Sequence, residues 1–178
     1  AVNFAGSQGV LVVSSAGNNG VDLDHDRNFV NVPAQSGSGI SIWAGDIDGN
    51  LASYSNHGLS GALVGAGGGD STPGSPQIPL PGCALPAFGH DGIVSVCSTF
   101  SLFFNCGPAS VLFNGTGTSF SAPVASGVAA LVDGKHNGSK NAGQLKTILE
   151  NSADDLGKKG ADNIFSQGRV NANEAVKK

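Results

Sequence analysis

Several kinds of residue are scarce in this chain. It contains no methionine, and charged residues make up only 12% of its 178 positions, with a formal net charge of -4. A surface so poor in positive charge argues against nucleic-acid binding, and no apolar run is long enough to cross a membrane as a helix. The chain begins with neither an initiator methionine nor a signal peptide, so we expect a processed or excised piece of a longer protein.

Glycine and apolar residues, in contrast, are plentiful. The chain has 28 glycines and is 39% hydrophobic. That apolar fraction is ample for a folded core, so the glycines indicate tight loops and close backbone packing rather than disorder. A length of 178 residues suits one domain with a real core and is too short for two large ones.

The chain has three cysteines, which is an odd number. Cys97 and Cys106 bracket a short hydrophobic loop and would suit a disulfide bond in an exported protein, which would leave Cys83 without a partner in this chain. The alternative is three reduced, buried thiols. The sequence leaves both alternatives open.

The order of the apolar patterns is that of an α/β fold. Residues 1–9 have the spacing of the last turns of a helix, and Val10–Val13 is the continuous apolar run of a strand buried on both faces. Further strands are expected at Ile40–Gly45 and Ile93–Cys97, and an amphipathic helix at Ala142–Asn151. The sequence therefore predicts a mainly parallel sheet that begins in the middle of a repeating pattern.

Two stretches rich in glycine or proline are expected to be loops. Gly65–Asp70 does not fit a dinucleotide fingerprint, because an aspartate replaces its third glycine and no helix pattern follows. Between Ser71 and His90 lie five of the eight prolines, which excludes regular secondary structure there.

The most informative stretch is Gly117–Pro123, which leads into the small apolar residues of Val124–Val132. A helix of such residues can be buried on every side. A hydroxyl in its first turn, such as that of Ser119, lies beside backbone N–H groups without intrahelical partners. These groups and the helix dipole would stabilise a nearby anion. The alternative is that Thr118 or Ser119 is an ordinary helix cap.

This stretch resembles the nucleophile motif of the subtilisin family of serine proteases. Gly-Thr-Ser-Phe-Ser-Ala-Pro corresponds to the family's Gly-Thr-Ser-Met-Ala-x-Pro, with Phe120 in place of the usual methionine. The resemblance implies that Ser119 is the nucleophile of peptide-bond hydrolysis through an acyl-enzyme, and that Thr118 contacts the substrate. It implies a secreted serine endopeptidase that acts on peptides or proteins.

A second motif lies upstream. Ser14–Gly20 resembles the family's Ala-Ala-Gly-Asn-x-Gly, which implies that Asn18 is the oxyanion-hole asparagine and that Ser15, Ala16 and Gly17 lie along the substrate. A carboxamide can direct N–H donors at a developing negative charge without adding a titrating group. Taken alone, Gly-Asn-Asn-Gly is an ordinary turn sequence.

The resemblance runs from near Ala1 to the end of the chain. Residues 52–56 match the family's Ala-Ser-Phe-Ser-Asn, and residues 168–176 match its closing motif. Residues 68–92 form a proline- and glycine-rich insertion, expected at the rim of the active site. A further match, to a segment with a cis proline in one wall of the substrate pocket, covers Asn31, Val32, Pro33 and Ala34.

An acidic loop follows the asparagine motif. Oxygen-bearing residues alternate in it: Asp22, Asp24, Asp26 and Asn28. Arg27 stands where an EF-hand calcium loop needs glycine, and no glutamate closes the site, so we expect a solvated acidic loop. An ion site of several family members would need an acid at the position of Ala62. No cofactor is therefore expected, and Ca²⁺ has no clear site.

The base that would activate the serine is missing from the chain. In the subtilisin family the Asp and the His precede the Asn and the Ser in chain order, and neither residue type occurs upstream of Asn18. The four histidines all follow it: His25, His57, His90 and His136. The resemblance therefore implies the C-terminal part of one peptidase domain, residues 1–178, whose partial three-layer fold lacks the N-terminal strands and leaves an exposed sheet edge beside Val10–Val13.

Two functions are consistent with this sequence. In the first, the chain is part of an extracellular peptidase whose Asp and His come from the N-terminal half of the same domain, and it is inactive alone. In the second, it is a non-catalytic remnant or binding fragment. The presence of both Ser119 and Asn18 favours the first, because a remnant has no chemical need for both.

Overall fold

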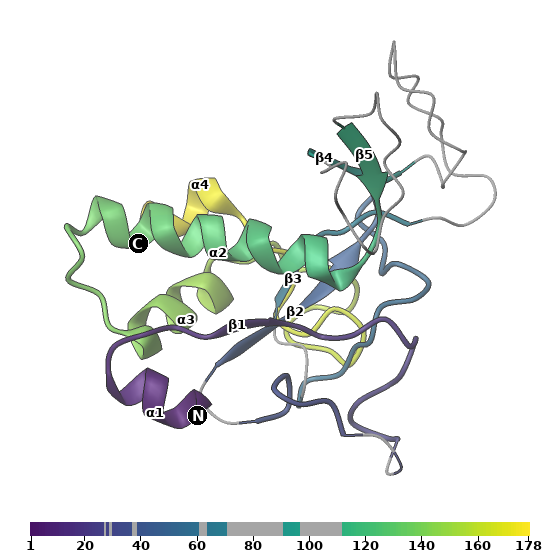
Figure 1. Ribbon diagram of the computed structural model, residues 1–178, viewed down its shortest axis with the longest axis horizontal. Coiled ribbons are helices and arrows are strands. Elements are labelled where there is room, and N and C mark those ends of the chain that lie inside the picture. The colour runs from purple at the N-terminus through teal and green to yellow at the C-terminus, as the bar shows by residue number, and fades with distance from the viewer. Residues whose placement is uncertain (27, 29, 37–38, 61–63, 71–90, 97–111) are drawn as a thin grey trace.

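The computed structural model describes residues 1–178 except 27, 29, 37–38, 61–63, 71–90 and 97–111 (Figure 1). Its elements follow in the order α1 (Val2–Ser7), β1 (Val13–Ser15), β2 (Ile40–Gly45), β3 (Val64–Gly67), β4 (Ile93–Val96), β5 (Leu112–Gly115), α2 (Thr118–Lys135), α3 (Ala142–Asn151) and α4 (Ala172–Ala175). The helices predicted at residues 1–9 and at Ala142–Asn151 are confirmed as α1 and α3.

Three parallel strands form the sheet on which the molecule is built. They lie in the order β1–β2–β3, with Ser14 opposite Ser41 and Trp43 opposite Gly65. The central strand, β2, is buried at every residue, as expected of a parallel strand with a neighbour on each side and cover on both faces. The predicted α/β fold with a parallel sheet is therefore confirmed.

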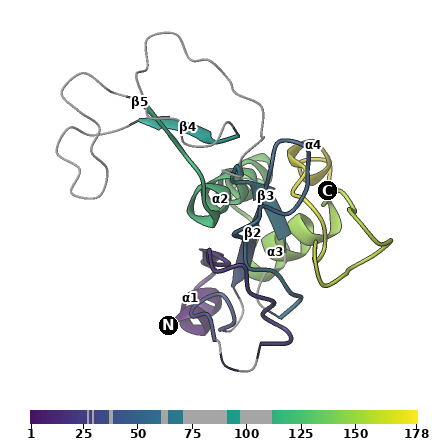
Figure 2. The ribbon, with the colours of Figure 1, turned by 90° about the vertical axis from the view of Figure 1, so that its right-hand side faces the viewer.

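Helices cover one face of this sheet (Figures 1 and 2). The long helix α2 packs on all three strands, and α3 and α4 pack against α2. The core between them is built from aliphatic side chains: Ile40, Ile42, Val64, Ala66, Ala125, Val128, Ala129, Val132, Leu145, Leu149 and Ala175. Fully burying each of the larger side chains stabilises the fold by about 1.5–3 kcal/mol, so this layer fixes α2 on the sheet.

The opposite face of the sheet is covered by the C-terminal loop. Trp43 is fully buried there and meets Phe165 edge to face, with ring centroids 5.6 Å apart. The Trp43 Nε1–H donates to the Phe165 carbonyl at 3.0 Å. The C-terminal loop thus packs on the face of the sheet opposite to α2.

Strand β3 corrects the prediction that Gly65–Asp70 is a loop. Residues Val64–Gly67 pair in parallel with β2. Glycine is required at Gly65 because a Cβ there would lie 2.1 Å from ring atoms of Trp43. Apart from Val64, the strand therefore lacks the β-branched and aromatic residues by which strands are usually predicted.

The predicted strand at Ile93–Cys97 is a strand as far as Val96, but it does not join the parallel sheet. It is β4, and it pairs antiparallel with β5 in a two-stranded ribbon, with Ile93 opposite Gly115. Strand β5 then leads directly into α2. The two-stranded ribbon thus leads into the first turn of α2, which carries Ser119.

The first strand also departs from its prediction. Strand β1 begins at Val13, although Val12 already accepts a hydrogen bond from Ile40. Val10 is 55% exposed and the three residues of β1 are only partly buried, so the run is not covered on both faces. In the described part of the chain β1 pairs with β2 alone, which leaves its other edge free.

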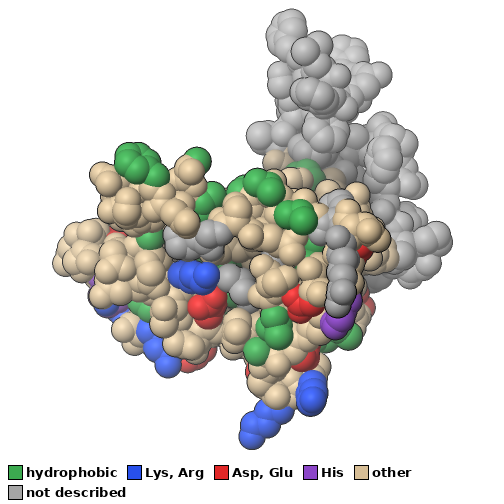
Figure 3. All heavy atoms as spheres, turned by 90° about the horizontal axis from the view of Figure 1, so that it is seen from below, with side chains coloured by type: hydrophobic (Ala, Val, Ile, Leu, Met, Phe, Trp, Pro, Cys, Tyr) green, Lys and Arg blue, Asp and Glu red, His purple; other side chains and the backbone are tan. Residues whose placement is uncertain are grey.

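Helix α2 is buried on one face only, which corrects the prediction that it lies wholly in the interior. Ser121, Ala125, Val128 and Val132 face the sheet and are buried, whereas Val124 is 43% exposed and Leu131 59% exposed. Apolar side chains also reach the surface in several separate places when the molecule is viewed from below (Figure 3). The outer face of α2 carries exposed apolar side chains that none of the described residues covers.

Some predictions lie outside the described residues. These are the three cysteines, most of the insertion at residues 68–92, and Ala62. Across the described helices, no segment is both long and apolar enough to cross a membrane.

Candidate active site

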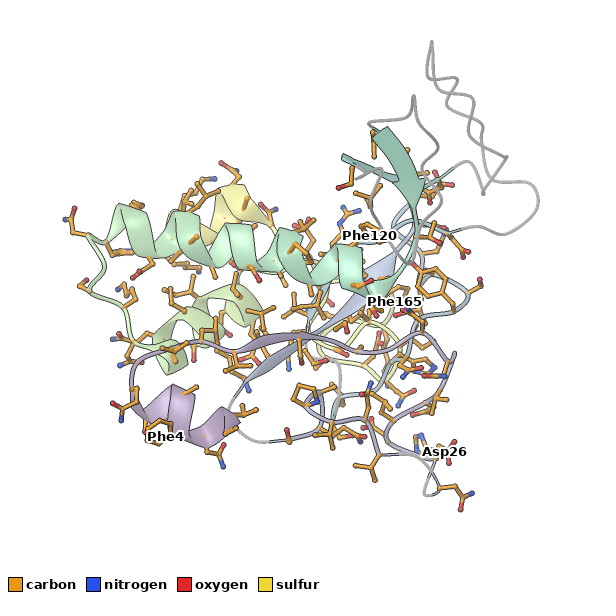
Figure 4. All side chains as sticks on the ribbon, viewed as in Figure 1. Phe4, Asp26, Phe120 and Phe165 are labelled. Carbon is orange, nitrogen blue, oxygen red and sulfur yellow. The ribbon has the colours of Figure 1, made fainter. Side chains whose placement is uncertain are left out.

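The first turn of α2 brings Ser119 to the surface beside the loop that follows β1. Ser119 is exposed, and Figure 4 shows Phe120 in this first turn of the helix. The residue before the helix, Gly117, has a φ of 150°, and no side chain caps the helix. The helix-cap alternative for Thr118 and Ser119 is therefore wrong, and their hydroxyl groups are available for other contacts.

Thr118 makes its contacts with Asn18. The backbone N–H and the hydroxyl of Thr118 donate to Asn18 Oδ1 at 2.9 Å and 2.7 Å, and the N–H of Gly17 donates to the Thr118 hydroxyl at 3.2 Å. Because Oδ1 accepts both bonds, the orientation of the carboxamide is fixed and its Nδ2 points away from Thr118. No acceptor for Nδ2 lies among the described residues.

Asn18 Nδ2 and Ser119 Oγ flank one small space. A Cβ built on Gly117 would lie 3.2 Å from Ser119 Oγ and 3.4 Å from Asn18 Nδ2. Only a glycine leaves this space open, and its φ of 150° is one that other residues rarely adopt. The structure thus brings together a hydroxyl and a carboxamide N–H₂ that are 101 positions apart in the chain.

A second asparagine, Asn56, holds the loop that carries Asn18. Its side chain is fully buried and bonds the backbone of Ala16, Asn19 and Val21. The sequence did not single out this residue, although it ends the Ala-Ser-Tyr-Ser-Asn stretch. The only signal in the sequence is its place at the end of a family motif, and nothing in the stretch itself marks its role.

The predicted pocket wall is only partly assembled around the serine. The Val32–Pro33 peptide bond is cis, which confirms that expectation. The Asn31 Nδ2 donates to the Ala16 carbonyl and so joins this segment to the asparagine loop. Val32 and Pro33, however, line a hollow of about 320 Å³ beside α1, with Ala1, Val2, Asn3 and Ser36.

The other residues predicted to contact substrate lie at the end of β1, just after it, or next to the cis proline. Ser15 ends β1 and is partly buried, and the side chain of Ala16 is fully buried against Trp43. Gly17 offers its carbonyl to Asn56 and has a φ of 98°. Ala34 follows the cis proline and is partly buried.

No base lies beside Ser119 in the part of the chain that the structure describes. His25 pairs with Asp22 at 2.7 Å, and the His57 ring bonds the Asn163 carbonyl at 3.1 Å. His136 follows the far end of α2, and His90 lies outside the described residues.

The acidic loop is exposed at Asp24 and Asn28, as predicted, and it is also held by hydrogen bonds. The Asp24 carboxylate accepts the N–H groups of Leu59 and Ser60, both at 2.8 Å, and Asn163 Nδ2 donates to Asp22 and Asp24. Burial alone would raise the pKa of Asp22, but bonds from His25 and Asn163 lower it to about 2. The loop therefore ties three segments together. Among the described residues no group of three acidic, histidine or cysteine side chains could hold a metal ion.

Comparison with known proteins identifies the class. A model of the Subtilase family matches residues 1–168. The chain belongs to the subtilase family, and its resemblance to that family is confirmed.

Alignment with individual relatives shows how much of a subtilase this chain corresponds to. Subtilisin BL from Lederbergia lenta is 30% identical over 177 residues, which are 99% of this chain and 50% of that protein. Thermitase from Thermoactinomyces vulgaris is 26% identical over 176 residues, or 47% of its length. The chain thus spans about half the length of these curated relatives.

Solved protease structures also superpose on nearly the whole of this chain. The structure of a lanthipeptide protease superposes with a TM-score of 0.76 at 30% identity, covering 99% of this chain and 53% of that one. The epidermin leader peptide processing serine protease from Staphylococcus aureus, at 18% identity and a TM-score of 0.71, supports the fold alone.

Proposed function

We propose that this chain is the C-terminal half of a subtilisin-like serine endopeptidase domain, with Ser119 as its nucleophile. The observation that carries the proposal is the Thr118–Asn18 pair, which fixes the Asn18 carboxamide so that Nδ2 faces the space beside Ser119 Oγ. A structural remnant would have no use for a free amide donor held at this place.

In the proposed reaction Ser119 Oγ bonds to the carbonyl carbon of the scissile peptide, and its proton passes to a base. The carbonyl oxygen becomes an oxyanion, for which Asn18 Nδ2 is one donor. The N–H of Thr118 is occupied by Asn18, and that of Phe120 donates to Gly117, which leaves the N–H of Ser119 as the second donor. The C–N bond then breaks, the amine leaves with the proton, and water hydrolyses the acyl-enzyme.

The base would be supplied by the N-terminal half of the same domain. Three features support a missing partner. In the described residues these are the free edge of β1 and the uncovered apolar face of α2, and the third is that the chain covers only about half the length of its relatives. A helix that is apolar all round is normally buried, and the exposed Val124 and Leu131 leave α2 incomplete. Covering these surfaces would complete one peptidase domain.

The substrates we propose are peptides or proteins, and the site of action is outside the cell. One superposed structure, at 30% identity, is named a lanthipeptide protease. A shorter match, 40% identical over 63 residues, is named an extracellular serine protease from Serratia marcescens. The alternative function is a non-catalytic binding fragment, which the free sheet edge would also suit.

Labelling by a fluorophosphonate tests the proposal. The chain alone should not be labelled, because Ser119 keeps an ordinary hydroxyl pKa without a base within reach. Co-expression with the upstream half of its domain should give labelling and peptide hydrolysis, both abolished by Ser119→Ala. A native mass measurement should show the two polypeptides together.

Two results would contradict the proposal. An assembled pair that is never labelled would favour the non-catalytic fragment. Stoichiometric labelling of the isolated chain, lost on His57→Ala or His90→Ala, would show that the base lies in this chain.

A further inference from the structure

A single buried side chain holds the backbone on both sides of Asn18. Asn56 is fully buried, and its Oδ1 accepts the N–H groups of Asn19 and Val21, each at 3.0 Å. Its Nδ2 donates to the Ala16 carbonyl at 2.9 Å, and its own backbone N–H donates to the Gly17 carbonyl at 2.9 Å. These contacts hold the backbone on both sides of Asn18, from Ala16 to Val21.

The chemistry of these bonds calls for a carboxamide. An acceptor must face two backbone N–H groups while a donor faces a carbonyl, and one planar amide provides both. The fit is close: a Cβ on Gly17 would lie 2.5 Å from Asn56 Nδ2. A longer side chain has no room here, and a shorter one reaches fewer of the three backbone groups.

Asn18 is thus fixed from two independent directions. Thr118 orients its carboxamide through Oδ1, whereas Asn56 sets the position of the backbone from which that side chain extends. If the loop shifts, Asn18 Nδ2 shifts with it and leaves the short range of a strong hydrogen bond to the oxyanion. A displacement of about 1 Å in a catalytic group can cost 10²-fold in rate.

We propose that Asn56 is a positioning residue for the reaction, which acts through Asn18 by holding residues 16–21 against the first turn of α2. This inference rests on the proposed function. It adds a buried residue, outside the nucleophile and asparagine motifs, on which oxyanion stabilisation depends.

The test uses the chain assembled with its N-terminal half. Asn56→Ala should lower kcat about 10–100-fold with KM changed little, because the loss is felt when the oxyanion forms. If Asn56 acts through Asn18, the same substitution in an Asn18→Ala background should cost much less. Asn171→Ala is the matched control, since that asparagine bonds Asp154 and caps α4. It should lower the Tm and leave kcat unchanged.

Asn56→Asp tests the donor role without leaving a cavity. Ionised, the new carboxyl keeps its acceptors for Asn19 and Val21 but places an oxygen against the Ala16 carbonyl. Protonated, it can donate to that carbonyl again. The kcat of this variant, divided by that of the unsubstituted enzyme at the same pH, should therefore rise as the pH falls.

The outcomes separate this inference from the proposed function. An assembled enzyme with no Ser119-dependent hydrolysis overturns the proposed function, and with it a catalytic role for Asn56. An active enzyme in which Asn56→Ala leaves kcat unchanged, or lowers it equally with and without Asn18, overturns the positioning role alone. In the assembled enzyme, hydrogen exchange at the amides of Asn19 and Val21 should accelerate in Asn56→Ala, and unchanged protection would show that Asn56 does not hold the loop.

Discussion

Replacing Gly117 by alanine is the most direct test of the space between the serine and the asparagine. The added methyl carbon would lie 3.2 Å from Ser119 Oγ and 3.4 Å from Asn18 Nδ2. A reacting carbonyl must bond to the first atom and bring its oxygen to about 2.7–3.1 Å from the second. A methyl group and this tetrahedral centre cannot both occupy that volume.

The size of the effect follows from two separate costs. Loss of one oxyanion donor costs about 10²–10³ in kcat, and Gly117→Ala obstructs the donor and the nucleophile together, so we expect a loss at least that large. Alanine at a φ of 150° also adds backbone strain, on the order of 1–3 kcal/mol. At about 2–4 °C per kcal/mol for a domain of this size, the Tm should fall by a few to about 10 °C.

The assay is peptide hydrolysis and fluorophosphonate labelling of the assembled enzyme, with thermal unfolding measured alongside. Gly134→Ala is the control, since it lies near the far end of α2 with no atom within 4 Å of an added Cβ. It should raise stability by about 0.5–1 kcal/mol and leave kinetics unchanged. Hydrolysis by Gly117→Ala within about threefold of the unsubstituted enzyme would refute the view that the reaction takes place in this space, since the obstruction should cost at least the 10²-fold of a lost donor.

Three further predictions follow. Asn18→Ala should lower kcat by about 10²–10³ and raise KM far less, and an unchanged kcat would remove Asn18 from the site. Because Phe120 replaces an oxidisable methionine and the chain has no methionine at all, activity should survive mild peroxide better than that of a methionine-bearing relative; rapid inactivation with unmodified cysteines would count against this placement. The pKa of Asp22 falls from 3.8 to about 2 on folding, so its stabilisation is complete above the unfolded value and is lost as the pH falls towards 2. In Asp22→Asn, the Tm measured between about pH 4 and pH 2 should therefore vary less steeply, and an equally steep decrease would show that Asp22 has no part in it.

The parts of the site that the sequence predicted are carried by continuous motifs. Ser119 and Thr118 are adjacent in one motif and Asn18 lies in another, so resemblance placed each without knowledge of the fold. The structure adds the hydrogen bonds by which Thr118 orients Asn18. Local pattern was also sufficient for α3, whose apolar spacing and Asn141 capping box define both ends.

The features that were missed depend on contacts between distant residues. Strand β3 contains glycine because Trp43 covers it, and that cover is invisible in a window of a few residues. Asn56 bonds a carbonyl 40 positions upstream, so no local pattern marks it. The outer face of α2 is exposed because no described residue packs on it, whereas the composition of α2 is that of a helix covered on all sides.

The contact of Trp43 with Phe165 also bears on how the protein is made. Its donor and acceptor are 122 positions apart, and at synthesis rates of about 5–20 residues per second the ribosome needs roughly 6–24 s to pass from one to the other. During that interval β2 has emerged from the ribosome, but the C-terminal loop against which the Trp43 indole packs has not yet been made. A nascent chain would therefore present its central strand to chaperones until nearly the last residues are made, and the fluorescence of its sole tryptophan would report when the C-terminal loop finally closes over that strand.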